Sequence, residues 1–348
     1  MNLTAQEKER RNTMILGTVF TVLTAIMLIL MMLVLRNLII PTDQPDVQYA
    51  QIPELVGMNI AEAKQKLDEL GISYRIVPGL TKTPNVVEKI EYAGKTEGGK
   101  ILVELGTRIK LYANEVDASK IIYLTFDDGP IVNYDNSMQV TNTTGKLLEI
   151  LDKHKVKASF FLVGYQMIKE DRSKFVNDIY DGGHLIACHT FSHDLNDIYS
   201  HPSAFMDDVH LFEEKLENIL GKEKYDSIPK CIRFPGGSST NGLLTKSKAL
   251  EYITEARADG YRVYDWTALT NDADNRYRLD GESDKDYFIR SMMSGIESSA
   301  KSGKPIILLM HDKKATTDCL DELLEYLIDK GYYFDTLVNC PEYTFAEN

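Results

Sequence analysis

The sequence predicts an α/β domain built on a largely parallel sheet, preceded by a small α+β domain and one membrane-spanning helix. From residue 121 onward, short apolar segments with strand character alternate with amphipathic segments at helical spacing. This is the pattern of a parallel sheet covered by helices. Near the N-terminus, residues 13–35 form a run without a charge, long enough to cross a bilayer as a helix.

Composition and charge limit the classes of partner. The chain has 348 residues, of which 43% are apolar, so it can bury a large core and form more than one domain. Its formal net charge is −13 and no basic stripe is visible, so we expect no nucleic-acid partner. Cys188, Cys231, Cys319 and Cys340 lack Cys-x-x-Cys spacing, and both pairing and free buried thiols stay open.

The predicted membrane helix covers residues 13–36 and follows a cytoplasmic tail, residues 1–12. Three basic residues precede the apolar run and only Arg36 follows it directly, so the positive-inside rule places the N-terminus in the cytoplasm. A cleaved signal is the alternative, but the run is longer than a signal core and no Ala-x-Ala site follows it. We expect a single-pass protein of the cell membrane whose C-terminal part is extracellular.

Residues 37–50 are expected to form a linker, and residues 51–115 a small α+β domain. Apolar residues at helical spacing precede Gly71, and three segments have strand character, at residues 72–77, 100–105 and 107–113.

This segment resembles a PASTA domain, a small extracellular module of peptidoglycan-associated proteins. The resemblance lies in residues 52–58, the helix that ends at Gly71, and residues 106–111. The usual Gln-x-Pro stretch of that family is absent, so a spacer and a ligand-binding module both remain open.

The α/β domain is expected over residues 118–343. Its expected strands lie at residues 121–124, 158–163, 185–188, 261–266 and 305–310. Its expected helices lie at residues 146–153, 248–258 and 320–328. A further helix is expected to begin at a Ser203 cap and to end at Gly221.

Asp127 and Asp128 are the first candidate site residues, because they leave a buried strand where a Gly-Pro pair ends it. His189 and His193 follow another apolar segment, and their spacing lets two imidazoles reach one ion. Such a histidine pair alone is weak evidence, since it is often a surface or core feature. Two imidazoles and one carboxylate, however, are typical of a catalytic zinc site that leaves a position open for water.

Two further motifs follow apolar segments. His311 ends the expected strand at residues 305–310, where parallel sheets collect their loops, which makes it a candidate general acid; a histidine that only caps the strand is the alternative. Arg233 opens an Arg-Phe-Pro-Gly-Gly segment and could anchor a carboxylate. The glycines would let backbone amides approach a substrate closely.

Together these motifs resemble the polysaccharide deacetylases of carbohydrate esterase family 4, the NodB-homology domain, over roughly residues 118–343. The resemblance implies a distorted (β/α) barrel that binds a divalent metal, with Zn²⁺ expected and Co²⁺ or others not excluded. It implies Asp127 as catalytic base, His311 as acid, Arg233 orienting the base and Asp272 tuning proton transfer. The implied metal ligands are Asp128, His189 and His193, and the implied substrate or oxyanion contacts are Pro235, Gly236, Trp266 and Leu309.

Four positions depart from the pattern of that family. Gly236 stands where a tyrosine is common, Leu269 where an aspartate is common and Ala273 where a tryptophan is common. Cys188 replaces a common asparagine. The backbone N–H of Gly236 can still donate a hydrogen bond without the tyrosine side chain. The loss of the tryptophan at position 273 removes part of an aromatic wall.

The resemblance implies removal of N-acetyl groups from an extracellular glycan. The membrane helix and the PASTA-like module favour peptidoglycan, with N-acetylglucosamine preferred to N-acetylmuramic acid. In the expected reaction Asp127 takes a proton from water, the metal and the Gly236 amide hold the oxyanion, and His311 protonates the amine. The alternatives are an O-acetyl esterase on xylan-like polysaccharide and a wall-binding protein of weak activity.

Overall fold

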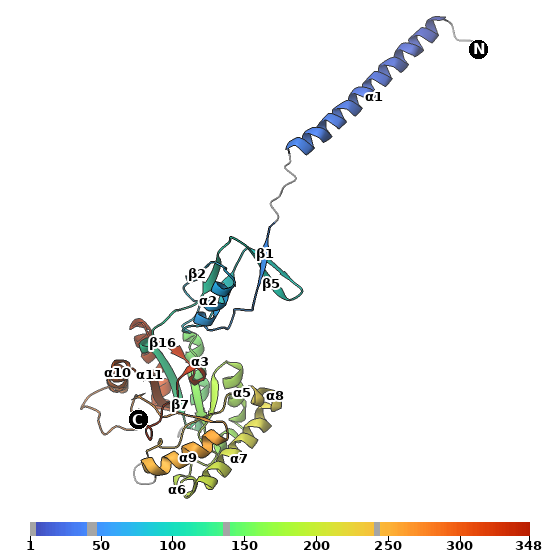
Figure 1. The fold of residues 1–348 in the computed structure, drawn as a ribbon. Coiled ribbons are helices and arrows are strands. Elements are labelled where there is room, and N and C mark those ends of the chain that lie inside the picture. Colours follow the sequence, from blue (N-terminus) through green and yellow to red (C-terminus); the bar gives the residue numbers. More distant parts are fainter. Residues whose placement is uncertain (1–4, 40–46, 135–139, 240–243) are drawn as a thin grey trace. The chain divides into compact units, whose positions relative to one another are not determined.

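The computed structural model describes residues 5–39, 47–134, 140–239 and 244–348 (Figure 1). These residues divide into two compact units. The first comprises the chain up to Pro53 together with Tyr92–Thr107, and the second comprises Glu54–Glu91 and Arg108–Asn348.

The first unit contains a long helix and a three-stranded antiparallel sheet. Helix α1 covers Ala5–Ile39, and the sheet has the order β1 (Tyr49–Ile52), β5 (Lys100–Glu104), β4 (Gly94–Glu97). Within α1, Lys8–Leu35 has a mean hydropathy of 2.7 and is unburied, so it is long and apolar enough to cross a membrane. A helix of this kind serves as a membrane anchor or as a signal sequence.

The second unit begins with a short helix and a small mixed sheet. Helix α2 (Ile60–Glu69) starts at Asn59, whose side chain caps it, and the sheet has the order β2 (Tyr74–Val77), β6 (Ile109–Tyr112), β3 (Lys89–Glu91). Residues 51–115 thus contribute to both units, and the single PASTA-like domain stays a prediction.

The main sheet of the second unit is a parallel half-barrel of eight strands, as expected for an α/β fold. Its order is β13-β12-β11-β10-β7-β15-β14, and β16 also pairs with β7. The strands are β7 (Ile121–Asp127), β10 (Ser159–Leu162), β11 (Leu185–Cys188), β12 (Cys231–Ile232), β13 (Arg262–Val263), β14 (Ala268–Leu269), β15 (Ile306–His311) and β16 (Tyr333–Asp335). A separate antiparallel pair joins β8 (Val132–Tyr134) and β9 (Val140–Asn142).

Helices cover the outer face of this sheet (Figure 1). They are α3 (Thr143–His154), α4 (Gly164–Met167), α5 (Ser173–Asp181), α6 (Leu195–Ile198), α7 (Pro202–Leu220), α8 (Lys222–Asp226), α9 (Lys246–Ala258), α10 (Asp284–Ser302) and α11 (Lys314–Asp329), with 3-10 turns at Ala118–Lys120 and Leu337–Asn339.

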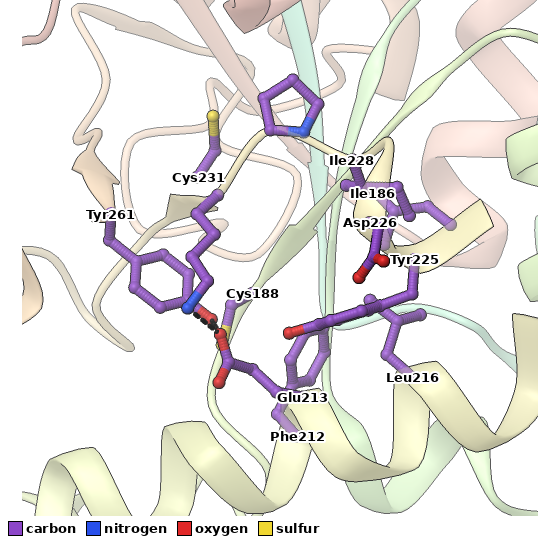
Figure 2. A pocket seen from close by; sticks show the side chains of 12 residues that line it. Ile186, Cys188, Phe212, Glu213, Leu216, Tyr225, Asp226, Ile228, Cys231 and Tyr261 are labelled. Carbon is purple, nitrogen blue, oxygen red and sulfur yellow. Dashed lines mark hydrogen bonds and ion pairs between the residues drawn. The ribbon is translucent and has the colours of Figure 1, made fainter. Parts of the chain in front are cut away.

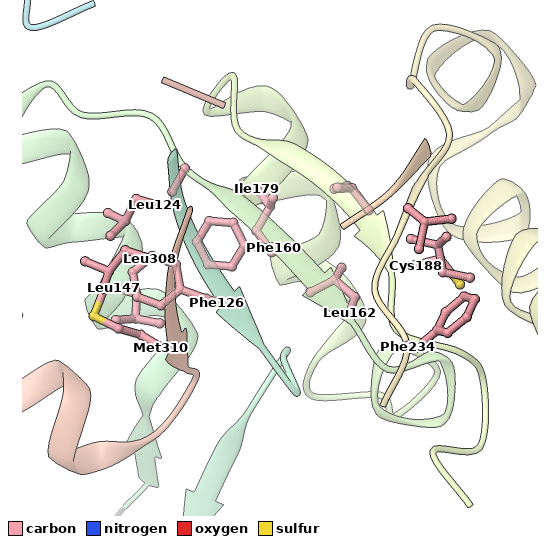
Figure 3. Packing of buried hydrophobic residues seen from close by; sticks show 14 of the residues in the cluster. Leu124, Phe126, Leu147, Phe160, Leu162, Ile179, Cys188, Phe234, Leu308 and Met310 are labelled. Carbon is pink, nitrogen blue, oxygen red and sulfur yellow. The ribbon is translucent and has the colours of Figure 1, made fainter. Parts of the chain in front are cut away.

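Strand periodicity sorts β7 into two faces. Leu124 and Phe126 pack into the helix-covered core, where the Phe126 and Phe160 rings stack with centroids 5.1 Å apart (Figure 3). Tyr123 belongs to a second cluster on the other face of the sheet. Because side chains alternate along a strand, Asp127 shares the face of Tyr123 and leaves the helix-covered core.

Three expectations are corrected or resolved by the structure. The strand expected at residues 261–266 is only Arg262–Val263, because its partner β12 ends at Ile232; the next residue, Tyr264, forms an isolated bridge to Tyr343. Ser203 does not cap α7; Pro202 takes the first helical position, and the His201 side chain accepts the Ala204 N–H. All four cysteines are buried free thiols.

Candidate active site

The acidic pair lies at the carboxyl end of β7, where neighbouring strands also end. Asp127 is the last residue of β7 and is in register with His311 of β15 and Phe161 of β10. Asp128 follows with φ 73°, in the left-handed region that aspartate tolerates better than most residues. Both carboxylates lie 3.7 Å from His189 Nε2, but Asp127 also pairs with Arg233, whereas Asp128 also contacts His193.

Asp128, His189 and His193 bring one donor atom each to within 4.8 Å of one another. Asp128 Oδ1 lies 3.7 Å from His189 Nε2 and 3.6 Å from His193 Nε2. His189 Nδ1 lies 2.8 Å from the Arg233 carbonyl oxygen, which can only accept, so Nδ1 carries the proton and the Nε2 lone pair faces Asp128. This donor set fits a divalent metal ion.

The loop that carries the histidines is held in an unusual backbone conformation. Thr190 has φ 64° and His193 φ 56°; for a β-branched residue this region is rare and needs support from its surroundings. The Thr190 hydroxyl accepts the His193 N–H at 3.2 Å. Asp208 of α7 accepts the N–H groups of Phe191 at 2.5 Å and Ser192 at 3.0 Å. Asp208 therefore positions the loop, a role for which the sequence carries no motif.

Arg233 is fully buried and holds Asp127. Its Nη1 donates to Asp127 Oδ1 at 2.7 Å and to the Thr125 hydroxyl at 2.8 Å. Its Nε and Nη2 donate to the carbonyls of Tyr264 and Asp265, at 3.1 and 3.0 Å. The guanidinium is thus fixed by four acceptors, and it leaves Asp127 Oδ2 directed toward the histidine side, 3.7 Å from His189 Nε2.

His311 is coupled to Asp272, as the sequence motifs suggested. Asp272 accepts the His311 ring Nδ1–H and the His311 backbone N–H, both at 2.8 Å, and also the Thr316 hydroxyl at 2.5 Å. Burial opposes a charged imidazole, but the hydrogen bond and charge of Asp272 outweigh it and raise the pKa of His311. Burial likewise opposes a charged Asp272, yet His311 holds the pKa of that carboxyl below its usual range.

One open cleft exposes one member or more of the donor set and of the His311–Asp272 pair, whereas Asp127 and Arg233 lie buried and do not line it. Asp128 and His193 of the donor set line it, and so do His311, Ala273 and Tyr165. Ala273 contributes only a methyl group to this wall, at the position where the sequence led us to expect room in place of a tryptophan.

Asp312 is a buried carboxylate beside this cleft that sequence reasoning missed. Its Oδ2 accepts the Thr144 hydroxyl at 2.5 Å, its backbone N–H donates to the Asp127 carbonyl at 2.9 Å, and burial raises its pKa to about 6. Its Oδ1 is buried without a hydrogen-bond partner among the described residues. The residue ties the end of β15 to the corner that carries the acidic pair.

The sequence profile of the polysaccharide deacetylase family matches residues 114–254, which include both aspartates, both histidines and Arg233. This part of the chain is therefore similar to the polysaccharide deacetylases.

Several similar proteins are peptidoglycan deacetylases. A peptidoglycan-N-acetylglucosamine deacetylase of Bacillus cereus is 28% identical over 227 residues, which are 63% of this chain and 86% of the relative. The peptidoglycan-N-acetylmuramic acid deacetylase PdaA of Bacillus subtilis is 27% identical over 63% of this chain and 70% of its own. The crystal structure of the catalytic domain of the peptidoglycan N-acetylglucosamine deacetylase from Eubacterium rectale matches with a TM-score of 0.51 and 28% identity, over 65% of this chain and 92% of that chain.

The other residues expected from the deacetylase motifs are not among those that line the cleft. Trp266 packs edge-to-face on Phe345, with ring centroids 4.9 Å apart, and Leu309 is buried in β15. The Pro235 carbonyl accepts the Tyr199 hydroxyl at 2.7 Å. Among the described residues no hydrogen bond occupies the Gly236 N–H, and Gly236 has φ 79°. The roles of these four residues as substrate or oxyanion contacts stay predictions.

A second cavity shares no lining residue with this cleft (Figure 2). Its charged groups are already paired, because Glu213 accepts from Lys230 Nζ at 2.7 Å and from the Tyr261 hydroxyl at 2.9 Å. Cys188 opens toward this cavity, although it directly precedes His189, and burial raises the pKa of its thiol. The cysteine therefore lies on the far side of its strand from the donor set.

Two other groups of histidine and carboxylate lie close enough to share an ion, but each already holds a lysine. Lys153 Nζ is 2.6 Å from Asp321, which also contacts His154. Lys230 Nζ is 3.1 Å from Asp259, the neighbour of His210. In the described part of the chain, the Asp128 group is the one of the three that forms no ion pair with a lysine or arginine.

Proposed function

We propose that this chain is a metal-dependent N-deacetylase that acts on N-acetylglucosamine residues of peptidoglycan. The observation that carries the proposal is the meeting of three units at the carboxyl ends of the strands: the Asp128 donor group, the Asp127–Arg233 pair and the His311–Asp272 pair. The peptidoglycan deacetylases among the relatives support the substrate.

The residues divide the reaction among them. Asp128, His189 and His193 would hold a divalent ion, with Zn²⁺ as the first candidate, and such an ion would polarise the acetamide carbonyl. Asp127, fixed at one oxygen by Arg233, accepts a proton from the attacking water through the other. His311 donates a proton to the departing amine nitrogen as the C–N bond breaks, and acetate and a free amine result. The unoccupied N–H of Gly236 is the proposed backbone donor to the oxyanion.

The N-terminal part of the chain would place this chemistry at the wall. We propose that α1 is a single-pass anchor with its basic end in the cytoplasm and that the catalytic domain is extracellular. The PASTA-like residues 51–115 would act as a spacer. Protease added to intact cells should remove the catalytic domain and leave a membrane-bound fragment.

Acetate release tests the proposal directly. The purified protein is expected to release acetate from N-acetylated wall glycan, to lose this activity on chelation, and to regain it with Zn²⁺ or Co²⁺. Asp128→Ala should lose bound metal and activity together. If wild type releases no acetate and Asp128→Ala behaves identically, the proposal of a deacetylase is refuted. Faster hydrolysis of acetylated xylan than of the amide substrate would instead support the O-acetyl esterase.

Asp272→Asn is expected to shift the basic limb of the pH–rate profile to lower pH. The reaction needs protonated His311, and Asp272 raises the pKa of that imidazole. Removal of the negative charge lowers this pKa, so His311 loses its proton at lower pH and activity falls first on the alkaline side. Asp274→Asn is the matched control, because Asp274 pairs with exposed Arg276. An unchanged basic limb in Asp272→Asn would rule out this role of the pair.

A further inference from the structure

Lys313 is a lysine on the cleft wall, and its charge helps to lower the pKa of Asp272. It lines the same cleft as Asp128, His193 and His311. Among the described residues that line the cleft it is the sole lysine or arginine, and no hydrogen bond or ion pair to its ammonium group occurs within the described part of the chain. The preceding Asp312 turns its carboxylate to the Thr144 hydroxyl instead.

The neighbouring lysine shows how different this position is. Lys314 forms an i,i+4 ion pair with Asp318 on α11 and does not line the cleft. Lys313 is the residue before α11, and its side chain makes no capping hydrogen bond. The positive end of the sixteen-residue helix dipole therefore adds to the lysine charge at this point of the cleft.

The cleft that Lys313 lines has space for a substituent. Ala273 lines the cleft with a methyl group, and a bulky group attached to a sugar can be accommodated there. An ammonium group in a partly enclosed cleft attracts an anion, and a carboxylate gives a charge-assisted hydrogen bond.

We propose that Lys313 binds a carboxylate carried by the glycan next to the acetamido group that is hydrolysed, so that the site selects acidic glycans over neutral ones. This inference rests on the proposed deacetylase function and narrows its substrate class. The carboxylate can belong to an acidic ether on the sugar or to a peptide attached to it; both sources present the same group to the ammonium.

The test compares three oligomers of equal length: neutral N-acetylglucosamine, an oligomer with a free carboxylate on alternate sugars, and one with a peptide carboxylate there. Wild type should have a kcat/KM about tenfold higher on at least one acidic oligomer than on the neutral one. Lys313→Met should lose this preference through KM and keep its rate on the neutral oligomer. Lys314→Met is the control and should match wild type. The acidic oligomer that Lys313→Met binds more weakly than wild type does identifies the source of the carboxylate.

Other results overturn the inference. If Lys313→Met loses kcat/KM equally on all oligomers and its pH profile shifts, Lys313 acts on the Asp272–His311 pair. If Lys313→Met has the same kcat/KM as wild type on every oligomer, the lysine has no role in substrate binding. If wild type releases no acetate at all, the proposed function fails. Calorimetric binding of the acidic oligomers then tests the carboxylate site separately. Weaker binding by Lys313→Met than by Lys314→Met would still support the carboxylate site, and equal binding would reject it.

Discussion

Asp127→Asn is expected to lower kcat for acetate release by about a thousandfold while the protein keeps its metal. The amide has the size of the carboxylate and can still accept the Arg233 hydrogen bond, but it cannot take a proton from water. Asp127 is outside the three-residue donor group, so metal content should equal that of wild type. Steady-state kinetics and metal analysis on the same preparation measure both quantities.

Asp128→Asn is the matched comparison, since it changes the adjacent carboxylate by the same atoms. It should weaken metal binding and be partly rescued by excess metal, whereas Asp127→Asn should not be rescued. Retention of a tenth or more of wild-type kcat by Asp127→Asn would show that another group accepts the proton.

Arg233→Met is expected to lower the free energy of unfolding by about 3–5 kcal/mol, because it leaves Asp127 buried without its cation. Acetate release should fall as well, since the base loses the donor that orients it. Denaturant unfolding monitored by circular dichroism gives the stability. Arg257→Met, which removes partly exposed ion pairs to Glu347 and Glu342, is the control and should cost less than about 1 kcal/mol.

A double variant separates the two contributions. Arg233→Met with Asp127→Asn removes both buried charges, so it should be more stable than the sum of the single losses predicts. Additive losses would mean that packing of the Arg233 stem, and not its pairing with Asp127, accounts for the destabilisation.

The groups that the sequence predicted best are those that follow continuous apolar strands. Asp127 and His311 each end such a strand, and parallel pairing of β7 with β15 brings them into register. Polar residues that directly follow apolar segments were therefore sufficient to predict that the acidic pair, the two histidines and His311 lie at one edge of the sheet.

The supporting residues could not be found in the same way. Asp208 holds the histidine loop from a helix, and Thr316 holds Asp272 across 44 positions of the chain. Such partners are chosen by tertiary contact and leave no local pattern. Helix α10 was overlooked although its signal is present: Ser283 caps it, and its buried face repeats at helical spacing through Tyr287, Met292 and Ile296.

Local rules also failed where a neighbouring residue competed. Ser203 is a good capping residue, but Pro202 is suited to the first helical position and moved the cap to His201. Strand β13 is short because its partner β12 has only two residues, and its neighbour Tyr264 bridges to Tyr343 in the C-terminal segment. That segment takes over pairing beyond Val263.

Arg233 contributes to the site through two chemically independent parts. Its carbonyl oxygen orients the ring of His189, a proposed metal ligand, while its guanidinium orients Asp127, the proposed base. A side-chain substitution removes only the second contribution, because every residue has a carbonyl. Side-chain substitutions at position 233 would therefore reveal only the effect of Arg233 on Asp127. Its effect on metal affinity would appear only when the backbone after β12 is shifted, for example by a one-residue insertion.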